Sequence, residues 1–163
     1  MLKSILAAAT AGFAMAAAFC AGAAPTGVPP LSVYGRLPNI EQVEISPDGK
    51  QLAIAVTDGE KRMLIIREAA QGGKLVAGMN FGDTKLRGVQ WAGMDHVLVT
   101  TSSAAEVNGL SGPKREYWMA FDYDLITKKQ RLLLGNQDRS MNVVLGSPVV
   151  RFIDGVPTAF VGR

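Results

Sequence analysis

Ile45-Ser46-Pro47-Asp48-Gly49-Lys50-Gln51-Leu52-Ala53 is the stretch that decides the fold. Proline fixes φ at the second position of a turn, aspartate suits the third, and glycine takes the left-handed conformation that closes a hairpin. Val43 and Ile45 alternate with polar neighbours before this turn, and after it Leu52, Ile54 and Val56 alternate with the small residues Ala53 and Ala55. A period of two predicts two antiparallel strands joined at Ser46–Gly49.

Two more short strands complete the first unit. Asp58-Gly59 turns the chain again, residues 63–67 form a third strand, and residues 74–77 form a fourth strand after Gly72-Gly73. Four antiparallel strands within about 35 residues make one compact sheet.

The pattern then starts again after about 45 residues. Val89-Gln90-Trp91 matches Val43-Glu44-Ile45 at a shift of 46, and residues 96–99 match residues 51–54 at a shift of 45. The next strand carries large side chains at alternate positions, namely Tyr117, Met119, Phe121 and Tyr123. A turn at Thr127-Lys128-Lys129 and a strand at 131–134 complete this unit. A third unit begins at 149–152, turns at Asp154-Gly155 and returns through 158–161.

A repeat of about 45 residues with four strands in each unit is the signature of β-propeller blades. We therefore expect an all-β fold of four-stranded antiparallel blades in an incomplete β-propeller. Blade 1 is expected at about 43–80, blade 2 at 87–135 and the start of blade 3 at 143–163. A plain β-sandwich is the alternative, because its strands alternate as well, but the self-match favours the propeller.

The first 23 residues have the layout of a helical signal peptide. Lys3 provides a short positive region, an apolar stretch runs from Ile5 to Cys20, and Ala21-Gly22-Ala23 ends the segment with small residues. Cleavage after Ala23 places small residues at both recognition positions. Cleavage one residue later would leave Pro25 next to the scissile bond.

Two other interpretations of this segment fit its residues less well than a signal peptide does. An uncleaved anchor needs about 20 strongly apolar residues, whereas this stretch consists mostly of alanine. A lipoprotein needs a small residue before the acylated cysteine, and Phe19 precedes Cys20. The favoured signal peptide predicts a periplasmic or secreted protein, with no membrane attachment after cleavage and with residues 24–42 as a lead segment.

The composition argues against several kinds of site. After the first 24 residues, 16 of the 17 Lys and Arg and all 14 Asp and Glu remain, a formal charge of +2. A nucleic-acid binder normally shows a clustered excess of cations, so no nucleic-acid partner is expected. Cys20 is the single cysteine and His96 the single histidine. The sequence therefore predicts no disulfide, no thiol nucleophile, no metal cage of cysteines or histidines, and no cofactor.

The Ser-Pro-Asp-Gly motif at 46–49 resembles the blade motif of bacterial periplasmic propellers. The wider pattern resembles the N-terminal propeller of exported serine peptidases of the prolyl oligopeptidase family, the dipeptidyl and acylaminoacyl peptidases. The resemblance covers nearly all of the chain after the signal segment. It rests on the signal, the motif and three further stretches, Tyr34-Gly35-Arg36-Leu37-Pro38, residues 89–100 and Tyr123–Lys128.

The resemblance implies an α/β-hydrolase domain after the propeller, which carries the catalytic Ser, Asp and His. A nucleophile elbow needs Gly-x-Ser-x-Gly, and the nearest string, Gly109-Leu110-Ser111-Gly112-Pro113, has its last glycine displaced. His96 follows Asp95 at an expected turn and precedes any such serine, so we interpret it as an exposed turn residue. No catalytic, cofactor-binding or metal-binding residue is therefore expected, and the chain alone is not expected to be an enzyme.

Two functions remain open. The first is a non-catalytic propeller fragment of a peptidase, truncated before the catalytic domain, that shapes the access of peptides; its partner is the missing hydrolase domain or another protein. The second is a stand-alone periplasmic propeller-type module that binds another protein. A long polar loop is expected at Ser102–Pro113; its favoured interpretation is a variable insertion, and the alternative is a contact surface. Trp91 and Trp118 are expected in the core between blades, and Lys114–Glu116 and Lys128-Lys129 on solvated turns.

Overall fold

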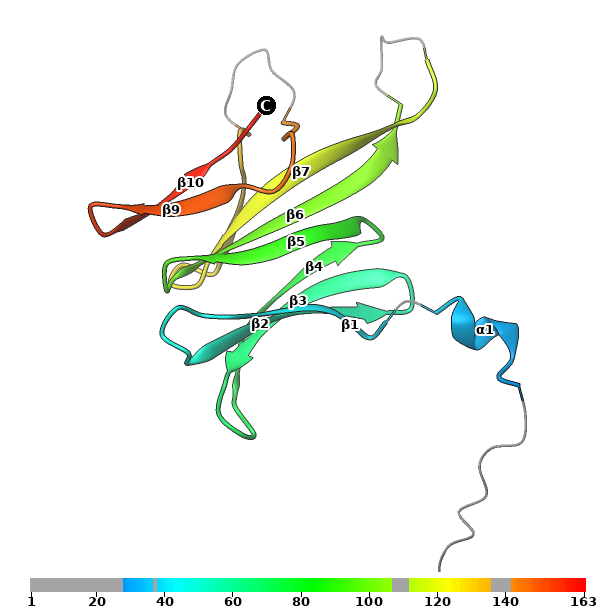
Figure 1. The fold of residues 1–163 in the computed structure, drawn as a ribbon, viewed down its shortest axis with the longest axis horizontal. Coiled ribbons are helices and arrows are strands. Elements are labelled where there is room, and N and C mark those ends of the chain that lie inside the picture. Colours follow the sequence, from blue (N-terminus) through cyan, green and yellow to red (C-terminus); the bar gives the residue numbers. More distant parts are fainter. Residues whose placement is uncertain (1–27, 37, 107–111, 136–141) are drawn as a thin grey trace, which may run out of the picture. The chain divides into compact units, whose positions relative to one another are not determined.

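The computed structural model describes residues 28–36, 38–106, 112–135 and 142–163 (Figure 1). The chain divides into residues 1–35 and residues 36–163. In the first unit the described part contains the single helical turn α1 (Leu31–Tyr34), which the sequence did not predict. The second unit is all-β. The expected signal peptide, its cleavage site after Ala23, and Ser111 lie outside the described residues.

Sheet 1 contains four antiparallel strands in the order β1-β2-β3-β4. These strands are β1 (Ile40–Ile45), β2 (Gln51–Asp58), β3 (Lys61–Glu68) and β4 (Leu75–Gly82). Each strand is joined to the next by a tight connection, as the turn residues predicted. The first strand begins at Ile40, inside the stretch that was expected to be the lead.

Sheet 2 repeats this topology in the order β5-β6-β7-β8. Its strands are β5 (Lys85–Ala92), β6 (His96–Ala105), β7 (Arg115–Asp124) and β8 (Lys129–Leu132). A two-stranded hairpin follows, which consists of β9 (Val149–Ile153) and β10 (Val156–Phe160). The described residues thus form two four-stranded sheets and a hairpin, and they contain no closed propeller.

The Ser46–Gly49 turn has the structure that its residues predict. Gly49 has φ +73° and donates its N–H to the Ser46 carbonyl at 2.8 Å. The Ser46 hydroxyl donates to Asp48 Oδ1 at 2.6 Å and accepts the N–H of Gln51 at 2.9 Å. Asp48 also accepts the Lys50 N–H, and these hydrogen bonds, the one from Ser46 first, lower the pKa of its carboxyl. The turn therefore sets the register of β1 on β2.

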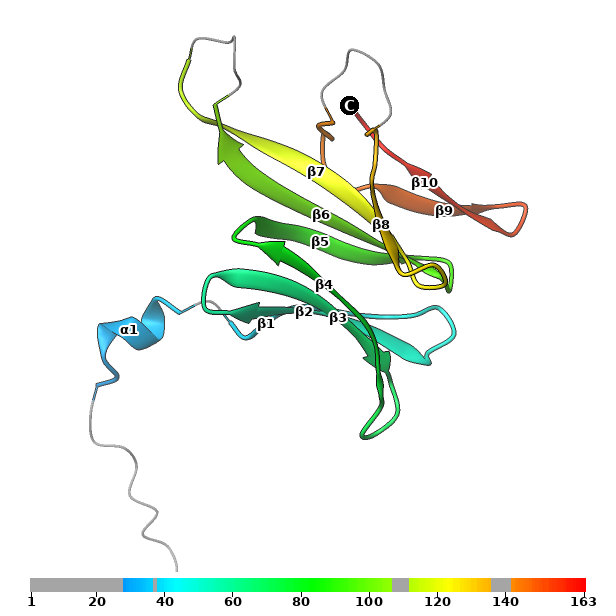
Figure 2. The same ribbon diagram turned by 180° about the vertical axis from the view of Figure 1, so that it is seen from behind.

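The main core lies between sheets 1 and 2. Sheet 1 contributes small and aliphatic side chains, namely Ala53, Ala55, Leu64, Ile66, Ala77 and Met79. Sheet 2 contributes Val89, Trp91, Val97, Val99, Tyr123 and Leu125. A fully buried aliphatic side chain contributes about 1.5–3 kcal/mol relative to an exposed one. The hairpin lies on the other side of sheet 2, as both views show (Figures 1 and 2).

Several strand boundaries differ from the sequence prediction: the fourth strand of sheet 1, expected at 74–77, is β4 at Leu75–Gly82, and two further differences lie in sheet 2. The last strand of sheet 2 is β8 at Lys129–Leu132 and not 131–134, because the Asp124 carboxylate accepts two backbone N–H groups of the preceding turn and Lys128 turns the chain with φ +58°. Strand β6 extends to Ala105. Ser102 therefore lies in this strand, fully buried, and not in the predicted loop.

Candidate functional site

A cavity of about 510 Å³ lies between sheet 2 and the C-terminal hairpin. Sheet 2 and the turn after it contribute the wall residues Ala92, His96, Leu98, Asp122, Arg131 and Leu133. The other wall comes from the hairpin and the residue after it, namely Val156, Pro157, Thr158, Ala159 and Val161. Most of this lining is apolar, with one group of charged side chains on the side of sheet 2.

The charged group is centred on Asp122, a β7 residue whose side chain is only 8% exposed. Its Oδ1 lies 2.8 Å from His96 Nδ1, and its Oδ2 accepts a hydrogen bond from Arg131 Nη2 at 3.1 Å. A carboxylate can only accept, so Nδ1 of His96 carries the hydrogen in this pair. A buried carboxylate needs such partners, because losing its hydration is costly without them.

Strand pairing brings these three residues together. Asp122 lies directly opposite Arg131 on β8 and opposite Leu98 on β6. His96 is two residues before Leu98 and on the same face, so its ring reaches Asp122 diagonally. The sequence separations are 26 and 9 residues.

An imidazole oriented by a carboxylate is the arrangement that general acid–base catalysis uses. Catalysis by this route also needs a nucleophile or an activated water in reach. Among the described lining residues the only hydroxyl is that of Thr158, which donates to the carbonyl of Val156 at 3.3 Å. The cluster therefore supplies hydrogen-bond donors beside an apolar wall, an arrangement that is suited to binding a ligand.

The structure corrects the interpretation of His96. The residue is the first of β6, its side chain is 41% exposed, and it is held by Asp122 and not by the neighbouring Asp95. Sequence reasoning missed Asp122 and Arg131. The available signal was the position of Asp122 in β7, where it lies between the aromatic residues Phe121 and Tyr123 and shares a strand face with Ala120.

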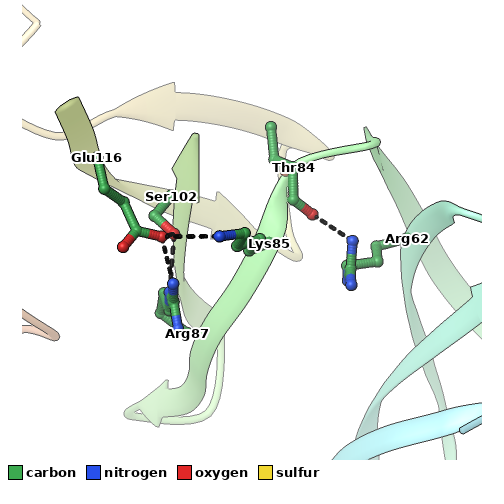
Figure 3. Close-up of polar contacts among 6 residues, drawn as sticks. All are labelled: Arg62, Thr84, Lys85, Arg87, Ser102 and Glu116. Atoms are coloured by element: carbon green, nitrogen blue, oxygen red, sulfur yellow. Dashed lines mark hydrogen bonds and ion pairs between the residues drawn. The ribbon is translucent and has the colours of Figure 1, made fainter. Parts of the chain in front are cut away.

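A second polar cluster lies at the opposite end of sheet 2 (Figure 3). The Glu116 carboxylate accepts hydrogen bonds from Arg87 and, at 2.9 Å, from Ser102 Oγ. Arg87 Nε also donates to Ser102 Oγ at 2.7 Å, and Lys85 Nζ lies 3.5 Å from the same carboxylate oxygen. The hydrogen bond from Arg87, followed by that from Ser102, lowers the pKa of Glu116.

Arg87 also covers an aromatic ring, since its guanidinium lies 5.2 Å from the ring centroid of Trp118. Trp118 is half-buried and is absent from the core between the two sheets, so its predicted core position is wrong. The predicted core position of Trp91 is confirmed, because this residue is 8% exposed and its Nε1 donates to the Glu44 carbonyl of sheet 1. The two tryptophans therefore have different roles.

Residues 107–111 of the expected loop at Ser102–Pro113 lie outside the described residues. Another part of this loop, up to Ala105, belongs to β6. Glu116, expected on a solvated turn, lies instead in β7 with three polar partners. Lys128 lies on a turn as predicted, and its Nζ reaches the Val76 carbonyl of sheet 1 at 3.4 Å.

No protein family matches this chain, and neither a curated protein nor a solved structure is found to be similar to it. In the described part of the chain, no helix has the length and apolar character needed to cross a bilayer. The same residues contain no group of three or more His, Cys, Asp or Glu side chains placed to hold a metal ion.

Proposed function

We propose that this chain is the N-terminal part of a β-propeller from an exported serine peptidase of the prolyl oligopeptidase type. In this proposal its sheets are blades, it acts without catalysis, and it shapes the access of peptides to a hydrolase domain. The observation that carries the proposal is the way in which the sheets stack.

Equivalent residues of the two sheets face in the same direction. Val89 and Trp91 of β5 are buried against sheet 1. Their repeat equivalents in β1, Val43 and Ile45, lie on the opposite face of sheet 1 from the core and are 49% and 57% exposed. A β-sandwich packs the inner faces of two sheets together and leaves polar outer faces. In a propeller, each blade packs the same one of its two faces on the blade before it. The apolar outer face of sheet 1 therefore supports a propeller-type stack of blades rather than a β-sandwich.

The first strands of the three units are also linked in series. The Gln42 side chain of β1 binds the backbone of Val89 in β5. The Gln90 side chain of β5 donates to the carbonyl of Pro148, the residue before β9. Blades have their first strands side by side around a common axis, and this serial link supports that arrangement.

A stand-alone binding module is the second candidate. It is favoured by the cavity beside His96, Asp122 and Arg131, because a small set of polar donors on a mostly apolar wall is typical of ligand sites.

Two measurements test the proposal. The purified chain should not hydrolyse peptides or esters and should not react with a fluorophosphonate serine probe. The genomic reading frame after Arg163, in the same or a shifted frame, should encode further repeats of about 45 residues and then Gly-x-Ser-x-Gly. A downstream sequence with neither feature would overturn the peptidase origin and favour the binding module.

A further inference from the structure

A cavity of about 190 Å³ lies between sheets 1 and 2, beside the core that joins them. Strand β4 and the turn after it form one wall, and strands β6, β7 and β8 form the other. The cavity shares no residue with the one beside the C-terminal hairpin. It therefore belongs to the two four-stranded sheets alone.

Much of the lining is aromatic and apolar. Phe81 of β4 and Phe121 of β7 are neighbours across the two sheets, with ring centroids 6.1 Å apart and ring planes tilted by 54°. Met119, two residues before Phe121 in β7, also lines the cavity. Tilted aromatic pairs and contacts between a sulfur and an aromatic ring are both favourable. These three side chains therefore suit a further aromatic ring.

Thr101 places a hydroxyl group in this apolar lining. The residue is 1% exposed and lies in β6 on the same face as the core residues Val97 and Val99. Its Oγ1 has no hydrogen-bond partner among the described residues. A buried hydroxyl without a partner is destabilising. At the equivalent position of sheet 1, 45 residues earlier, the chain has Val56, so an apolar residue can occupy this position of the repeat.

The other polar groups of the lining are hydrogen-bonded or exposed. Thr84 Oγ1 donates to the Phe81 carbonyl at 3.0 Å, and Asn80 Oδ1 accepts a backbone N–H at 2.7 Å. Asn80 and Gln130 are exposed and lie where the cavity opens to solvent. A buried water needs about two to four polar partners. The unpartnered Thr101 hydroxyl is therefore better suited to a molecule that fills the apolar space and carries one hydrogen-bonding group.

We propose that this cavity binds a single-ring aromatic molecule with one hydroxyl group, of the size and chemistry of phenol. The volume suits one ring, since an apolar cavity of about 150 Å³ accommodates benzene. The ring packs on Phe81, Phe121 and Met119, and its hydroxyl forms a hydrogen bond with Thr101 Oγ1. The site lies within sheets 1 and 2 and is independent of the peptidase origin proposed above.

Isothermal titration calorimetry of the full chain with phenol and with benzene tests the role of Thr101. The parent chain should bind phenol more tightly than benzene. Thr101→Val keeps the shape of the side chain and removes the hydroxyl, so the ratio of phenol affinity to benzene affinity should fall by about five- to tenfold. Thr100→Val is the matched control, because Thr100 is equally buried in β6 but lies on the opposite face, outside the cavity. It should leave the ratio unchanged, and circular dichroism should show that both variants are folded.

A measurement on the parent chain locates the bound ring. The ¹³C methyl signal of Met119, assigned with Met119→Leu, should shift when phenol is added, because of the ring current of the bound molecule. The signal of Met94, which is 46% exposed on the turn before β6, should not shift. A parent chain that binds no phenol at millimolar concentration, a preference for phenol that survives Thr101→Val, or equal shifts at Met119 and Met94 would each overturn the proposal.

Discussion

Gln42 holds both backbone hydrogen-bonding groups of Val89 with its side-chain amide. Its Nε2 donates to the Val89 carbonyl at 3.0 Å, and its Oε1 accepts the Val89 N–H at 3.0 Å. These atoms belong to the free edge of β5, which would otherwise leave a buried N–H and carbonyl without partners. One side chain of sheet 1 thus satisfies the backbone groups of Val89 at the edge of sheet 2 and fixes the position of β5 along β1.

Gln42→Ala should lower the free energy of unfolding by about 1–3 kcal/mol, because the polar backbone groups of Val89 would stay buried without partners. Urea unfolding followed by circular dichroism measures the change. Gln130→Ala is the control, since Gln130 is exposed on β8 and its loss should change stability by no more than about 0.5 kcal/mol. Equal effects of the two substitutions would show that the link to Val89 does not hold the sheets together.

Arg62→Ala should be more destabilising than any exposed charge substitution. The Arg62 Nε lies 2.7 Å from Glu41 Oε1, with the two side chains only 13% and 16% exposed. Its Nη1 also donates to the Thr84 carbonyl, between the two sheets (Figure 3). Removing one partner of a buried pair costs about 3–5 kcal/mol, and the slight exposure here places the expected loss at the lower end.

Lys50→Ala is the matched control for this ion pair. The Lys50 side chain is 82% exposed beside Asp48, and exposed pairs contribute at most about 1 kcal/mol. Thermal unfolding of both variants gives the comparison. A loss for Arg62→Ala no greater than that for Lys50→Ala would contradict the structural role of Arg62.

Asp122→Ala should release the His96 ring. His96 is the single histidine of the chain, so its ring nitrogens give unambiguous signals in ¹⁵N NMR spectra. In the parent chain Nδ1 should be the protonated nitrogen of the neutral ring, because it donates to Asp122. The variant should lose this preference. Asp95→Ala, which removes the sequence neighbour that does not contact the ring, should leave the spectrum unchanged, and a change there would argue against the pairing.

Arg87→Gln should raise the pKa of Glu116 toward its ordinary value of 4.5, because the hydrogen bond from Arg87 is the main cause that lowers it. A lowered pKa in the folded chain means that this carboxylate stabilises the fold above pH 4.5 and that the contribution is lost as the pH falls through the folded-state pKa. Titration of the Glu116 carboxyl by ¹³C NMR measures the shift. Lys85→Gln should raise the pKa of Glu116 less, because the charge of Lys85 makes the smallest contribution to lowering it.

The sequence by itself determined the all-β class, the turn at Ser46–Gly49 and the two four-strand units with a hairpin after them. These are properties of near neighbours. Proline and glycine restrict φ at single positions, and a period of two puts alternate residues on opposite faces wherever the strand later packs.

Only the tertiary structure decided which residues meet across strands. Asp122 reaches His96 and Arg131 because antiparallel registers place residues 26 and 9 positions apart side by side. The same registers buried Ser102 and separated the two tryptophans, with Trp91 in the core and Trp118 under Arg87. A strand pattern states which face a residue occupies, but the partner of that face depends on how the sheets stack. That stacking is a sum of many weak contacts between segments distant in the chain, so no local motif encodes it.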